Sequence, residues 1–73
     1  MNKLEMTEII ITAKTQSGLS WEAIAAQVGL APVFITSACL GMNSLKAEPA
    51  DKLCQVLGLP AKVSTALQAF PHK

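Results

Sequence analysis

The side chains that could carry out chemistry are few in this sequence and lie far apart. The only histidine, His72, is the penultimate residue, and the two cysteines are Cys39 and Cys54. Zinc needs several such ligands at short, regular spacings, so we expect no metal ion and no cofactor. We predict that His72 lies in a solvated tail and that both cysteines are small, buried, apolar side chains.

Acid–base and nucleophilic catalysis find no better support. Glu5 and Glu8 are three residues apart, with Lys3 and Lys14 nearby, a pattern typical of the solvated face of a helix. No base lies near the serines, which are Ser17, Ser20, Ser37, Ser44 and Ser64. The sequence also lacks a glycine-rich loop for phosphate. We therefore predict no catalytic, cofactor-binding or metal-binding residue.

The composition predicts one small globular domain with an apolar partner surface. The chain has 73 residues, of which 51% are apolar and 15% charged, against about 25% charged in a typical protein. Six lysines, five acidic residues and no arginine give a net charge of +1. This balance disfavours a strongly basic nucleic-acid binder, a polybasic membrane anchor and a disordered chain. Because a chain of this size buries only about 60% of its surface, the apolar excess indicates a partner.

The sequence shows no targeting signal. Glu5 and Glu8 interrupt the N-terminal region, where a signal peptide needs an unbroken apolar run. No stretch approaches the roughly 18 apolar residues needed to cross a membrane. We therefore expect a cytoplasmic protein with reduced thiols and no membrane partner.

The first helix is predicted from about Leu4 to Gln16. The β-branched run Ile9–Ile11 would also suit a strand. Helical spacing nevertheless places four apolar residues on one face: Met6, Ile9, Ile10 and Ala13. Leu4 and Ile11, one heptad apart, form a second stripe. A helix that is apolar on two sides has two surfaces to pack against, and the second could belong to a neighbouring subunit.

Two short helices should follow and form a helix-turn-helix. Ser20 is a good N-cap for a helix that ends at Gly29, and Pro32 suits the first turn of a helix to Leu40, which Gly41 ends. The predicted inward residues of the second helix are Trp21, Ile24, Ala25 and Val28. Its small residues and turn glycine, within Ser20–Ala31, are typical of a helix-turn-helix.

The remaining sequence predicts two more helices. A fourth runs from about Ala47 to Leu57, with Pro49 in its first turn, and Pro60 opens a fifth. Their expected inward residues are Ala50, Leu53, Val56, Leu57, Val63, Leu67 and Phe70. The prediction for residues 1–73 is thus one all-α domain, a compact bundle of about five short helices.

The third helix has little with which to read DNA. Its only polar groups are Thr36 and Ser37, and it lacks the side chains that make bidentate contacts to bases. Phosphate contacts would fall to Lys46, Lys52 and Lys14, with Glu48 and Asp51 nearby to offset them.

The same helix offers a surface for another protein. Val33 and Leu40 lie away from the expected core face of Phe34 and Ala38. We hypothesise that Val33 and Leu40 meet another protein surface.

The chain resembles the N-terminal helical domain of the cyanases, also called cyanate hydratases or cyanate lyases. The resemblance covers about residues 6–71 and is carried by these segments: Ile11–Lys14, Gly18–Ala25, Gly29–Ala31, Val33–Gly41, Ala50–Leu53, Leu57–Leu59 and Phe70–Pro71. The helix-turn-helix part is shared with many DNA-binding domains and is of the lambda-repressor-like type. The uncharged third helix favours cyanase over a repressor.

This resemblance implies an enzyme whose chemistry lies elsewhere. Family members decompose cyanate with bicarbonate, through carbamate, to ammonia and carbon dioxide without a metal. Their intertwined dimers assemble into a decamer, and their catalytic Arg, Glu and Ser come from a C-terminal domain that this sequence does not include. The resemblance therefore implies an N-terminal assembly domain that is inactive alone and forms a homo-oligomer.

Two other functions stay open from the sequence. One is a stand-alone DNA-binding helix-turn-helix protein, and the other is a stand-alone interaction or oligomerisation module.

Overall fold

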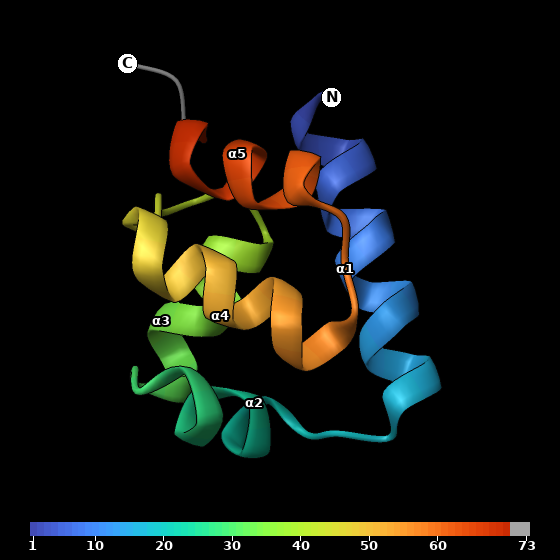
Figure 1. Ribbon diagram of the computed structural model, residues 1–73, viewed down its shortest axis with the longest axis vertical. Coiled ribbons are helices and arrows are strands. Elements are labelled where there is room, and N and C mark those ends of the chain that lie inside the picture. The colour runs from blue at the N-terminus through green and yellow to red at the C-terminus, as the bar shows by residue number, and fades with distance from the viewer. Residues whose placement is uncertain (71–73) are drawn as a thin grey trace.

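Five α-helices make up the part of the chain that the computed structural model describes, residues 1–70 (Figure 1). They are α1 (Lys3–Ser17), α2 (Trp21–Val28), α3 (Pro32–Cys39), α4 (Ala47–Leu57) and α5 (Ala61–Ala69). Residues 1–70 contain no strand, so the all-α prediction is confirmed and the strand option for Ile9–Ile11 is excluded.

Helix α1 begins at a reciprocal cap between Asn2 and Glu5. The Asn2 side-chain oxygen accepts from the Glu5 amide at 2.8 Å, and a Glu5 carboxylate oxygen accepts from the Asn2 amide at 3.1 Å. These two bonds satisfy amides that a helix start leaves unpaired, which allows α1 to begin one residue before the predicted Leu4. At the other end, Gly18 adopts a left-handed φ of 73°, which favours glycine.

Helices α2 and α3 follow the local signals of the sequence closely. The Ser20 hydroxyl accepts from the Ala23 amide at 3.1 Å, and Gly29 ends α2. Pro32 is the first residue of α3, which ends at Cys39, one residue before the predicted Leu40. The axes of the two helices are bent by 100° at the intervening turn, within the range of helix-turn-helix pairs.

Helix α4 crosses the middle of the molecule, with α5 on one side, α2 on the other and α1 alongside (Figure 1). The hydroxyl of buried Ser64 in α5 donates a 2.6 Å hydrogen bond to the Asp51 carboxylate in α4. Within α5, the side-chain amide of Gln68 donates to the same Ser64 hydroxyl at 3.3 Å. The bond between Ser64 and Asp51 thus ties α5 to α4.

The core draws fully buried side chains from all five helices: Met6, Ile10, Ile24, Ile35, Cys39, Leu53, Val63 and Leu67. One predicted core residue is wrong, because Phe34 is 39% exposed. The buried face of α3 is formed by Ile35, Ala38 and Cys39, and each residue advances a helix by about 100°. This rotation carries Phe34 to the edge of that face.

Among residues 1–70, no single helix is long and apolar enough to cross a bilayer. Helices α2 and α3 reach the necessary length and composition only when taken together across their 100° bend.

Candidate functional site

The most distinctive surface feature is a pair of exposed apolar stripes on α1 and α3. Leu4 and Ile11 are 66% and 37% exposed and lie one heptad apart on α1. Val33 in α3 and Leu40, the residue that directly follows α3, are 78% and 43% exposed and have the same spacing. The expectation that both pairs point away from the core is therefore confirmed. We call them the α1 stripe (Leu4, Ile11) and the α3 stripe (Val33, Leu40).

The two stripes meet where α1 packs against the end of α3. The hydroxyl of Thr7 donates a 2.8 Å hydrogen bond to the main-chain oxygen of Cys39. Thr7 lies one helical turn from both Leu4 and Ile11, and Cys39 directly precedes Leu40. A Cβ placed on buried Gly41 would clash with the side-chain stem of Lys3, so the two segments are in close contact. The stripes thus belong to one junction of the fold.

The outward face of α3 carries no basic side chain. The Thr36 hydroxyl donates to the main-chain oxygen of Pro32 at 2.9 Å, one turn back in the same helix. Its exposed residues, Val33 and Phe34 among them, are apolar. Such a face can bury surface against a protein but offers few groups for hydrogen bonding to base edges.

Two of the three lysines considered for phosphate contacts already interact with other side chains of the chain. Lys14 lies over the ring of Trp21, with its ammonium 5.0 Å from the ring centre. Lys52 forms an exposed ion pair with Glu48, one turn back on α4, at 3.3 Å. Lys46 is exposed and occupies the residue that precedes α4.

The structure does not bring the candidate chemical residues together. Glu5 is used in the cap of α1, and Glu8 is exposed. The Ser17 hydroxyl donates to the main-chain oxygen of Lys14 in its own helix, and Ser20 caps α2. No group of three or more metal-ligating side chains occurs in the described part of the chain, and His72 lies outside it. That the chain has no site residues of its own stays a prediction.

Both cysteines are buried and free, as predicted for small apolar side chains. Burial raises the pKa of the Cys39 thiol to about 12, with a further contribution from Cys54. Burial, with a smaller effect of the Asp51 carboxylate, raises the pKa of Cys54. A raised pKa keeps a thiol protonated at neutral pH, and the thiol form is a poor nucleophile. Neither cysteine therefore has the properties of a reactive one.

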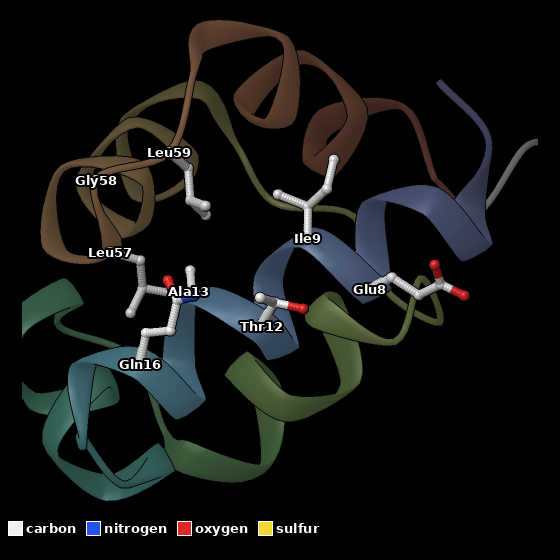
Figure 2. Close-up of a pocket in the computed structure, with 8 residues that line it drawn as sticks. All are labelled: Glu8, Ile9, Thr12, Ala13, Gln16, Leu57, Gly58 and Leu59. Atoms are coloured by element: carbon white, nitrogen blue, oxygen red, sulfur yellow. The ribbon is translucent and has the colours of Figure 1, made fainter.

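A shallow groove of about 480 Å³ lies between α1 and the α4–α5 turn. Figure 2 shows Ile9 of α1 and Leu59 of the turn pointing into the gap between these elements, whereas the carboxylate of Glu8 points away from it. Thr12, Ala13 and Gln16 complete the α1 side. The groove therefore does not bring charged groups together.

Sequence reasoning missed this groove and the exposure of Met42 and Phe34. The groove forms only when α1 packs on a turn more than 40 residues away, for which no local pattern exists. Met42 is 64% exposed in the segment that follows α3, outside any helical periodicity. The only feature of the sequence that indicated further exposed apolar residues was the apolar excess of the composition.

Comparison with known proteins gives consistent matches over the whole chain. The family model described as "Cyanate hydratase, N-terminal" matches residues 3–71. The cyanate hydratases of Marinomonas sp. (strain MWYL1), Pseudomonas putida and Teredinibacter turnerae are 51%, 51% and 49% identical to it over 73 residues. Each alignment covers all of this chain and 50% of the relative. The chain thus spans about half the length of the curated relatives it matches.

Proposed function

Since this chain belongs to the family of cyanate hydratase N-terminal domains, we propose that it serves as the assembly domain of an enzyme that decomposes cyanate with bicarbonate. The observation that carries the proposal is the match across residues 3–71, together with about half identity to named cyanate hydratases. Sequence identity at this level over a whole domain supports a common role.

In this proposal the domain supplies no catalytic group. The described acidic, hydroxyl and thiol side chains with assigned contacts serve as caps, helix contacts or core, and the sequence has no arginine. Binding and proton transfer to cyanate would then depend on the other half of the enzyme. The chain by itself should release no ammonia from cyanate.

The assembly role is supported by the α1 and α3 stripes. Val33 and Leu4 are the most exposed large apolar side chains of their helices, at 78% and 66%. Removing such side chains from water stabilises association by roughly 25 cal/mol per Å² of apolar area. We expect copies of the domain to pack such side chains, Val33 first among them, against other subunits, giving a homo-oligomer.

A domain exchange tests this function. The 73 matching residues of the Marinomonas cyanate hydratase would be replaced by this chain, and bicarbonate-dependent ammonia release from cyanate would be measured. We expect activity within about tenfold of the parent enzyme, because an assembly domain acts through packing rather than chemistry.

A matched control replaces the same residues by an unrelated five-helix domain of similar size, which should abolish assembly and activity. A well-folded exchange protein that is inactive would contradict the proposed function. Activity of the isolated 73-residue chain above a heat-treated sample would contradict the proposed absence of catalytic groups.

A further inference from the structure

Four of the seven exposed large apolar side chains in residues 1–70 lie in the segments at the start of α1 and directly after α3. They are Met1, Leu4, Leu40 and Met42, and we call them the exit face. Met1 lines a groove of about 330 Å³ together with Ala66, Ala69 and Phe70 from the end of α5. The start of the chain therefore lies against the last turn of its final helix.

The segment after α3 lies at the same end of the molecule. The amide of Leu45 donates a 2.9 Å hydrogen bond to the main-chain oxygen of Leu67 in α5. Lys3 contacts Gly41, which stands between Leu40 and Met42. Figure 1 shows the N-terminus of α1 and the whole of α5 at one end of the bundle. The four side chains thus belong to one region, formed by three segments distant in sequence.

Phe70 fixes where the chain leaves this region. Its side chain is 6% exposed, so it is anchored in the core. Its backbone is extended, with φ −94° and ψ 144°, which ends α5 at this residue. Phe70 therefore places the end of α5 at the groove that it shares with Met1 of the exit face.

We propose that the exit face is covered by the second half of a full-length cyanate hydratase, which packs apolar side chains on Met1, Leu4, Leu40 and Met42. This inference rests on the proposed function. The curated relatives are twice as long as this chain, so a polypeptide of equal size remains to be placed. A segment joined directly beyond Phe70 is held near the exit face at an effective concentration of about millimolar or more.

The two residues of the α3 stripe serve different contacts, one with the second half of the enzyme and one with other subunits. Leu40 belongs to the exit face, whereas Val33 lies seven residues away, about 10 Å along the helix. Val33 therefore stays available to other subunits.

Cysteine labelling tests the proposal. The variants Leu4→Cys and Met42→Cys would be made both in the 73-residue chain and in the full-length exchange enzyme described above. Gln27→Cys, at an exposed position of α2, is the matched control in both contexts. Cys39 and Cys54 are buried, so native labelling with a maleimide reports on the introduced thiol, and the unmodified proteins give the background.

We expect the thiols introduced by Leu4→Cys and Met42→Cys to react rapidly in the short chain. In the full-length enzyme they should react at least about tenfold more slowly, because burial restricts access. Rapid labelling in both contexts would overturn the proposal, since nothing then covers the face. Slow labelling in both would also overturn it, because a second copy of this domain would then be the occupant.

The two proposals fail in different ways. An active exchange enzyme with an unprotected Met42→Cys thiol refutes the exit-face contact alone. An inactive but folded exchange enzyme refutes the proposed function, whatever the labelling shows.

Discussion

The hydroxyl of Thr7 donates a 2.8 Å hydrogen bond to the main-chain oxygen of Cys39, 32 residues later in the chain. This bond joins the first turns of α1 to the last residue of α3, and its surroundings are partly buried. Together with the contact of the Lys3 stem with Gly41, it holds the α1 stripe beside the Leu40 end of the α3 stripe.

Replacing Thr7 by Val should weaken this junction. The change keeps the shape of the side chain and removes the donor, so we expect a loss of about 1 kcal/mol in the free energy of unfolding. Chemical denaturation followed by circular dichroism measures it. Thr15→Val, at an exposed position of the same helix, is the control and should change stability by less than about 0.5 kcal/mol. Equal effects of the two substitutions would show that the hydrogen bond contributes nothing measurable.

Gly41→Ala should destabilise the fold through two separate effects. Gly41 has a φ of 76°, and an added Cβ would overlap Cγ of Lys3. Gly18 has a similar φ of 73° with open space around it, so Gly18→Ala measures the backbone cost alone, about 1 kcal/mol. We expect Gly41→Ala to lower the free energy of unfolding by more than Gly18→Ala does, by a further fraction of a kcal/mol or more.

The extra loss at Gly41 is attributable to Lys3 only if the two sites are coupled. A double-mutant cycle with Lys3→Ala measures this coupling by thermal or chemical denaturation. Truncation of Lys3 should remove most of the excess cost of Gly41→Ala. Simple additivity of the two changes would show that the clash is relieved elsewhere.

Alkaline pH should destabilise the protein through Cys39. The folded-state pKa of this thiol is about 12, above its ordinary value of 9.0. Between these values the unfolded chain releases a proton that the folded chain keeps. The contribution of Cys39 to the free energy of unfolding is therefore complete below about pH 9. It declines toward pH 12, and the free energy of unfolding falls by up to about 1.4 kcal/mol per pH unit.

Unfolding free energies measured from neutral pH to about pH 11 check this. Cys39→Ala should be less stable at neutral pH because it leaves a cavity, but its stability should fall less steeply with pH. The two proteins differ only at residue 39, so the difference in slope belongs to the thiol. Parallel pH profiles would contradict the assignment to Cys39.

Val33→Glu should weaken self-association without weakening the fold. Val33 is 78% exposed, so the monomer loses little packing, whereas a buried carboxylate at an interface is costly. We expect the dissociation constant measured by sedimentation velocity to rise at least about tenfold, with an unchanged unfolding midpoint. Gln27→Glu adds the same charge at an exposed position of α2 and should leave association as it was. An unchanged oligomeric state in Val33→Glu would exclude the α3 stripe as a subunit contact.

Helix ends were predictable because the residues that form them act locally. Ser20 caps α2 with its own hydroxyl, Pro32 starts α3, and Gly29 takes up the left-handed backbone that few other residues tolerate. Each effect needs only neighbours within about four residues. The predicted bounds of the helices therefore agree with the structure to within one residue.

Burial depends on the whole fold and was harder to predict. Phe34 and Ile35 are adjacent apolar residues, and only the packing of α3 against α1 and α2 decides that Ile35 enters the core. The heptad pairs Leu4–Ile11 and Val33–Leu40 were predictable because seven residues return a helix to nearly the same side. The groove beside Ile9 was not, since its other wall at Leu59 belongs to a distant turn.

The shared groove of Met1 and Phe70 places the start of the chain beside the end of its last helix. A domain with this arrangement can be transferred between genes as a unit, because a host protein needs to accommodate it at only one place. Its removal likewise leaves no long gap to be bridged. Recombination could therefore join such a helical domain to different partners without altering the path of either chain.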